Sequence, residues 1–112
     1  MEDYNFVEIN KKKYPIRFGM NALRKYGMRT GTTLADLEKL GNGMNLESAL
    51  QLIFAGIEDG YRRAKQECKL DIEKLADLID DDHNAISKCM NILTKHIGGK
   101  NEKKPNPKSA KN

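Results

Sequence analysis

The most restrictive feature of this sequence is an apolar repeat at helical spacing in its middle third. Between residues 46 and 61, apolar side chains recur three and four positions apart, which is typical of a helix with one buried face. We expect a long helix here, with Asn45 as its N-cap. The repeat consists of Leu46, Ala49, Leu50, Ile53, Phe54, Ile57 and Tyr61, of which Leu50, Ile53, Phe54 and Ile57 form the strongest stripe and should be buried.

Two glycines interrupt this helix one turn apart, at Gly56 and Gly60. A glycine in a helix interior costs about 1 kcal/mol relative to alanine, so a structural reason for both is expected. Either another helix or a hairpin packs closely against this smooth strip, or the helix frays near Gly60.

Two short runs near the N-terminus predict a β-hairpin. Residues 4–9 and 14–18 are rich in aromatic and β-branched residues, and the polar turn between them holds Asn10, which tolerates a positive φ. Pro15 cannot donate a ladder hydrogen bond, so the second strand lies at an edge or turns that position outward. An isolated hairpin is marginal in water, and its apolar face must therefore rest on helices. That face carries Tyr14, Ile16 and Phe18.

Two shorter helices are expected between the hairpin and the long helix. The first follows Gly19 and stops near Gly31. Thr33 and Asp36 have the spacing of a capping box for the second, which carries three leucines spaced by three. A glycine-rich loop at residues 41–43 then separates this segment from the long helix.

Two further helices are expected after the long one. Asp71 caps the first, and a run of three aspartates closes it and can cap the second. The second carries an apolar stripe that continues to Ile97, and Gly98-Gly99 is expected to stop it. Together these segments predict an α+β domain over residues 1–98, with an N-terminal β-hairpin packed on a bundle of four to five helices.

The net charge of +4 belongs to the C-terminal segment. Residues 100–112 hold five lysines and one glutamate, whereas residues 1–98 carry fifteen basic and fifteen acidic groups. Residues 99–112 contain prolines and no large apolar residue, so a disordered basic tail is expected there. Because this charge does not belong to a folded surface, the composition disfavours nucleic acid as a partner.

No motif in the sequence points to catalysis, a metal or a cofactor. The three aspartates at 80–82 lack the alternating ligands and terminal glutamate of a calcium loop, and residues 27–33 lack the lysine of a phosphate loop. The cysteines and histidines contain no close ligand pair, although structural zinc sites nearly always start from one. They are Cys68, His83, Cys89 and His96. We expect a protein that is not an enzyme, with no cofactor and with two buried free thiols.

The sequence also predicts where the protein works. It contains no apolar run near the roughly 20 residues that a membrane span needs. Its first residues are acidic, and no apolar stretch of the kind found in secretory signals follows them. We therefore expect a cytoplasmic protein without a membrane partner.

The order of these elements resembles a known family. The hairpin ends in Tyr14-Pro-Ile-Arg-Phe-Gly-Met, and an Asn-Ala-Leu opening of a helix follows. In this the chain is similar to the tail assembly chaperones of long-tailed bacteriophages and prophages, and to related small proteins of gene transfer agents. The resemblance continues through residues 46–60 and 71–80 and covers about residues 5–98. The helix after Ala22-Leu23 is basic in this chain, where the family's is usually acidic.

The resemblance implies a non-enzymatic chaperone in the cytoplasm of a bacterial host cell. Such proteins bind the tape measure protein and help to recruit tail tube subunits, and a helix-in-groove contact would suit that role. Self-association is compatible with it. Two alternatives remain open: a small DNA-binding or regulatory protein, and a structural component of the virion tail. Residues proposed for a partner surface or for helix packing are Gly56, Gly60, Tyr61, Arg24, Met28 and Met90.

Overall fold

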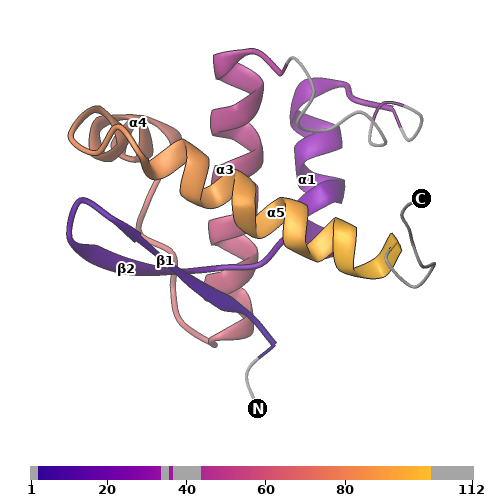
Figure 1. The fold of residues 1–112 in the computed structure, drawn as a ribbon, viewed down its shortest axis with the longest axis horizontal. Coiled ribbons are helices and arrows are strands. Elements are labelled where there is room, and N and C mark those ends of the chain that lie inside the picture. Colours follow the sequence, from indigo (N-terminus) through magenta and orange to yellow (C-terminus); the bar gives the residue numbers. More distant parts are fainter. Residues whose placement is uncertain (1–2, 34–35, 37–43, 102–112) are drawn as a thin grey trace, which may run out of the picture.

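The computed structural model describes residues 3–33, 36 and 44–101 (Figure 1). In chain order, a β-hairpin comes first and helices follow it, so the predicted α+β class is confirmed. In Figure 1, α3 stands at the centre, α1 packs along one side of it, α4 lies on the other side, and α5 crosses in front. The elements are β1 (Asn5–Ile9), β2 (Lys12–Ile16), α1 (Met20–Thr30), α3 (Leu46–Arg63), α4 (Ile72–Asp80) and α5 (Ala85–Asn101).

The hairpin closes through a tight turn at Asn10 and Lys11. Both residues have a positive φ, 52° and 69°, which is the left-handed conformation that a type I′ turn requires at its two central positions. The strands are antiparallel, and Ile9 pairs with Lys12 next to the turn. One face of the hairpin is buried, as predicted, and carries Val7, Ile9, Tyr14 and Ile16.

The hairpin rests on the glycine strip of α3. A Cβ atom on Gly56 would come within 2.6 Å of the Phe18 ring, and one on Gly60 would come within 2.6 Å of the carbonyl oxygen of Pro15. The backbone N–H of Arg17 donates a hydrogen bond of 2.9 Å to the carbonyl oxygen of Gly56. The prediction of a close approach at these two glycines is therefore confirmed. The alternative of a frayed helix is wrong, because α3 continues through Gly60.

The buried side of α3 differs from the predicted stripe. Ile53 and Ile57 are buried as expected, but Leu50 and Phe54 are only half-buried and Leu46 is 62% exposed. The hairpin packs on the glycine side of the helix, so the buried sector turns toward that side. Glycine has no side chain and so does not contribute to an apolar pattern. The sequence pattern therefore does not show that the glycine side of α3 is the buried one. Other residues that this sector buries are Ala49, Leu52, Ala55 and Asp59.

The predicted helix caps at Asn45, Asp71 and Thr33 are confirmed. The side chains of Asn45 and Asp71 each accept a hydrogen bond of 2.8 Å from the backbone N–H three residues on. Thr33 and Asp36 exchange the two hydrogen bonds of a capping box, at 3.2 and 3.4 Å. Gly31 ends α1 with a φ of 74°.

The expected helix stop at Gly98-Gly99 is wrong, because α5 runs through both glycines to Asn101. Glycine weakens a helix but keeps its backbone N–H, so two glycines do not interrupt the hydrogen-bond ladder as a proline would. The remaining tail and the predicted loop at residues 41–43 lie outside the described residues. The same holds for most of the short helix predicted before that loop.

Asp82 joins the hairpin turn to the start of α5. Its carboxylate accepts hydrogen bonds from the backbone N–H of Asn10 at 2.9 Å and of Asn84 at 3.1 Å. The Lys88 ammonium lies 3.3 Å from the same carboxylate and also donates to the carbonyl oxygen of Glu8 at 3.0 Å. These donors, the Asn10 N–H foremost, hold the pKa of Asp82 below its ordinary value of 3.8.

This lowered pKa predicts a pH dependence of stability. Asp82 is ionised in the folded state, so its stabilising effect should be present above the ordinary carboxyl pKa and lost as the pH falls through the lowered one. Asp82→Asn should therefore unfold at a lower temperature than the wild type at neutral pH, and this difference should shrink toward zero in acid. Thermal melts of both proteins from about pH 7 to about pH 2 measure it. A difference that is the same at every pH would contradict the electrostatic explanation.

Candidate protein-binding surfaces

One side of α3 presents apolar side chains to the surface. We call this set, Leu46, Leu50, Phe54 and Tyr61, the outer stripe of α3. Its members are four, four and seven positions apart, so they share one helical face. Leu46 is exposed, whereas the other three are half-buried. Phe54 and Tyr61 are partly buried against the core cluster. The outer stripe is therefore apolar surface that the fold leaves partly uncovered.

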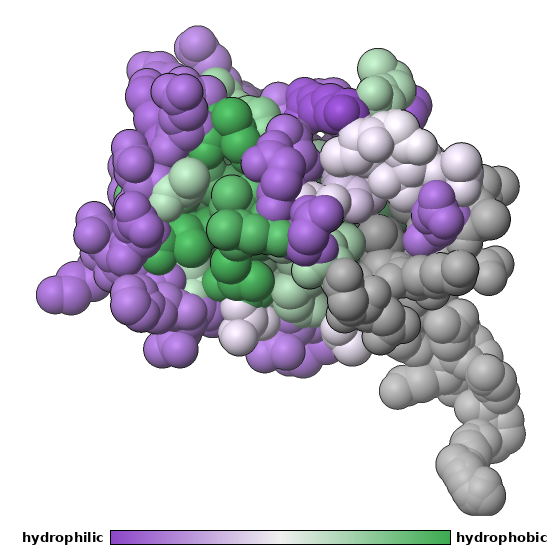
Figure 2. Space-filling view, turned by 90° about the horizontal axis from the view of Figure 1, so that it is seen from above, coloured by the Kyte–Doolittle hydropathy of each residue, from purple (hydrophilic) through white to green (hydrophobic). Residues whose placement is uncertain are grey.

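Figure 2 looks down on the end of the molecule at which α3 begins. Apolar residues gather there in one patch, over the first turns of α3 and the neighbouring α4, with hydrophilic residues around much of its edge. Leu46 begins α3 at this end. Scattered apolar residues are common on protein surfaces, but a contiguous patch with a polar rim is typical of a protein-binding site.

A basic residue of α1 borders the outer stripe. The Arg29 guanidinium lies 5.4 Å from the centre of the Phe54 ring and 2.7 Å from the Glu58 carboxylate. Farther along the stripe, burial raises the pKa of Tyr61 above 10.0, and the nearby Cys68 and Tyr14 raise it further. Tyr61 therefore keeps its proton and stays neutral at physiological pH. The outer stripe of α3 therefore consists of uncharged side chains, with the charged Arg29 and Glu58 at its edge.

The outward side of α1 carries a second exposed set. We call Met20, Arg24 and Met28 the outer face of α1; they are four positions apart, and the two methionines are 74% and 70% exposed. The opposite side of α1 buries Ala22 and Tyr26. Two of the predicted site residues, Arg24 and Met28, therefore lie together on the surface. Met20 was missed, although its spacing of four from Arg24 is visible in the sequence.

The other predicted site residues have different positions. Gly56 and Gly60 lie in the contact between α3 and the hairpin, so they are packing residues. Met90 lies on α5, half-buried against the core cluster. Tyr61 belongs to the outer stripe of α3. The structure thus divides the predicted set into internal packing positions and two separate surfaces.

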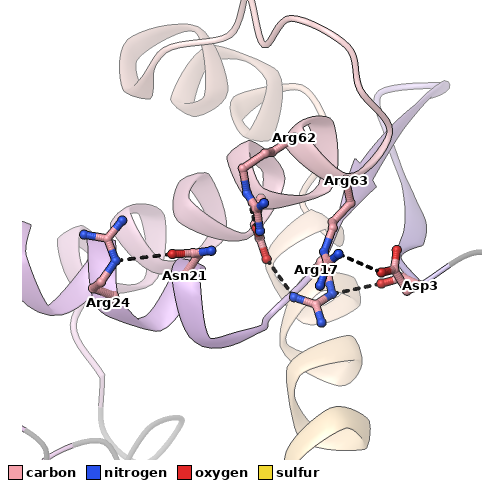
Figure 3. A network of polar contacts seen from close by, with 7 residues as sticks. Asp3, Arg17, Asn21, Arg24, Arg62 and Arg63 are labelled. Carbon is pink, nitrogen blue, oxygen red and sulfur yellow. Dashed lines mark hydrogen bonds and ion pairs between the residues drawn. The ribbon is translucent and has the colours of Figure 1, made fainter.

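A buried carboxylate anchors the polar contacts at the end of α3 (Figure 3). Asp59 is 2% exposed and accepts hydrogen bonds from Arg17 at 3.2 Å and from Arg62 at 3.1 and 2.7 Å. Arg17 also donates to the carbonyl oxygen of Asp3, whose carboxylate lies 3.1 Å from Arg63. Every charge in this network has a partner. The network joins Asp3, the segment that follows β2 and the end of α3, which is a structural role.

Neither thiol is activated for chemistry. Burial raises the pKa of Cys89 to about 12, and it also raises the pKa of Cys68. Both are free, as predicted, but Cys68 is half-buried instead of buried. Across the described ranges, no three histidine, cysteine, aspartate or glutamate side chains gather as metal ligands. These side chains do not suggest a nucleophile or a metal site.

The described surface also has shallow hollows, including the following two. One, of about 490 Å³, lies between β1 and α5 and is lined by Asn5, Phe6, Ile92, Lys95 and His96. The other, of about 320 Å³, lies beside α4 and is lined by Tyr14, Leu70, Lys74, Asp77, Leu78 and Asp81. Their linings mix charged and apolar side chains.

In comparisons with known proteins, no family model, no curated protein and no solved structure matches the chain. In the part of the chain that the structure describes, no helix has both the length and the apolar character to cross a bilayer.

Proposed function

We propose that this protein is a non-enzymatic assembly chaperone for the tail of a long-tailed bacteriophage or prophage. In this role it binds the tape measure protein and helps to recruit tail tube subunits in the cytoplasm of the host cell. The partners come from the resemblance of residues 5–98 to the tail assembly chaperones. The binding surface comes from the geometry of α3.

The observation that supports the proposal best is the outer stripe of α3. Leu46 begins the stripe 62% exposed, and Leu50, one turn further on, is half-buried. Fully burying an exposed leucine side chain contributes about 1.5–3 kcal/mol, so covering Leu46 would favour binding.

The dimensions of the stripe suit a helical partner. Tyr61 lies fifteen positions after Leu46, which corresponds to about 22 Å along a helix axis. An amphipathic helix of similar length, with apolar residues three and four positions apart, could lie along it. The Arg29 guanidinium at the edge would form part of the polar rim that surrounds the apolar centre of such contacts.

Substitution of Leu46 by aspartate tests the proposal. The tape measure protein used should come from the same phage or prophage genome and be produced together with this chain. Leu46→Asp should reduce the co-purified tape measure protein by about tenfold or more, because a carboxylate would enter an apolar contact. Leu46 is largely exposed, so the variant should keep the wild-type melting temperature.

Two variants serve as controls. Leu46→Met keeps an apolar side chain of similar size and should bind like the wild type. Phe6→Asp places the same charge on an exposed apolar residue of the hairpin and should also bind normally. Co-purification that is equally strong with Leu46→Asp would contradict the use of the outer stripe.

The same material distinguishes the alternative functions. Finding the protein in purified, finished particles would indicate a structural tail component. Retention on DNA by a chain truncated after Asn101 would indicate a DNA-binding protein, since the lysine-rich end would then be absent. Either result would count against a chaperone that acts only during assembly.

A further inference from the structure

We infer that the outer face of α1 is a second docking surface, which binds an acidic amphipathic helix of a partner protein. The inference rests on the proposed function only in treating the chain as an assembly factor that binds proteins. It concerns a different surface from the outer stripe of α3, and it specifies the chemistry of the partner.

The outer face of α1 has the form of a helix-binding contact. Met20 and Met28 are eight positions apart, about 12 Å along the helix, and Arg24 lies midway between them. Both methionines are more exposed than Leu46 or Phe6. Methionine is flexible and polarisable, so it adapts to the surface of a partner better than branched side chains do.

Arg24 differs from the other arginines because no ion pair with a carboxylate is found for it among the described residues. The chain has five arginines, and four of them lie within 4 Å of a carboxylate: Arg17, Arg29, Arg62 and Arg63. Among the described residues, Arg24 is held only by neutral groups. They are the Met28 sulfur at 3.4 Å and the Asn21 amide oxygen at 3.3 Å, a contact that Figure 3 shows. Its guanidinium is thus held along the outer face with its positive charge unmatched.

The positive charge of α1 predicts a negatively charged group on the partner. The helix contains Arg24, Lys25 and Arg29 and no acidic residue. Arg29 is neutralised by Glu58, and Lys25 is half-buried, so Arg24 supplies the charge of the outer face. A carboxylate on the partner would form a charge-assisted, bidentate contact with this guanidinium.

The arrangement favours a protein helix over nucleic acid. A nucleic-acid interface gains its affinity from several phosphate contacts, whereas this face offers one guanidinium between two apolar side chains. A helix with a glutamate flanked by apolar residues four positions away on each side would match all three groups. The methionines would bury the apolar residues, and Arg24 would pair with the glutamate.

A pair of designed peptides tests the inference on the full chain. The first is an alanine-based helical peptide that carries Leu, Glu and Leu at intervals of four, and the second has Lys in place of Glu. The first should shift the backbone NMR signals of α1 and bind more tightly than the second. Arg24→Glu should weaken the first peptide by about tenfold and reverse the preference, so that the Lys peptide binds better.

Several outcomes would overturn the inference. They are an unchanged affinity in Arg24→Glu, NMR shifts centred on α3, displacement of the peptide by a short DNA duplex, and occupation of the face by a second copy of the chain. Met20→Ser with Met28→Ser serves as a second variant and should weaken both peptides. Leu46→Asp separates the two proposals, because it should weaken binding of the tape measure protein by about tenfold or more and leave the peptides unaffected.

Discussion

Replacing Gly60 with alanine should lower the free energy of unfolding by about 2–3 kcal/mol, although alanine is the better helix former. The added Cβ atom would lie within 2.6 Å of the carbonyl oxygen of Pro15, which is backbone and cannot rotate away. Either the hairpin moves off α3 or the helix bends. Both responses disturb the packing of Ile16, which is fully buried. Chemical denaturation of the two proteins measures the difference.

Gly27 is the matched control, because it also lies inside a helix. A Cβ atom there would approach the carbonyl oxygen of Thr32 at 3.2 Å, a contact that a small adjustment can relieve. Gly27→Ala should therefore change the stability by less than about 1 kcal/mol in either direction. If Gly60→Ala were as stable as Gly27→Ala, the hairpin would not rest on the glycine strip.

Asp59→Ala should destabilise the fold by about 3 kcal/mol. The carboxylate is 2% exposed and accepts hydrogen bonds from Arg17 and Arg62. Removing one partner of a buried ion pair leaves the other without a counter-charge and typically costs 3–5 kcal/mol. Arg17 and Arg62 are partly exposed, so water can solvate them again, and the lower end of that range is expected. Urea unfolding at neutral pH measures it.

Asp3→Ala is the control for this prediction. Asp3 pairs with Arg63 in the same network, but both side chains are exposed, so the loss should stay below about 1 kcal/mol. Equal losses for the two variants would mean that the burial of Asp59 contributes nothing. A smaller loss in the double variant Asp59→Ala with Arg17→Ala than in the two single variants combined would measure the coupling directly.

Features that depend on neighbouring residues could be predicted from the sequence. Asn45 and Asp71 cap helices because a side-chain oxygen reaches the N–H three residues on, whatever the rest of the fold does. Gly31 ends α1 with a left-handed backbone for a similarly local reason. The hairpin turn at Asn10 was expected, although the sequence could not show that Asp82 would bind it from 72 residues away.

The candidate surfaces could be predicted only in part. The apolar repeat of α3 was evident, but four of its residues were assigned to the core and two of these, Leu50 and Phe54, are only half-buried. Periodicity shows which residues share a face, and it does not show how far a neighbouring element covers that face. Spacing likewise does not show whether Arg24 and Met28 pack inside the fold or face a partner. In the structure both lie on the outward side of α1.

The sequence by itself determined the hairpin, the helix caps, the long amphipathic helix and the absence of known catalytic motifs. The tertiary structure decided which side of α3 is buried. The hairpin settles on Gly56 and Gly60 because only there can its backbone approach the helix axis closely. That contact turns Asp59 inward, toward the guanidinium of Arg17, and leaves Leu46 and Leu50 at the surface. Local spacing sets which residues lie together, but the choice of the covered side depends on packing between segments about forty residues apart.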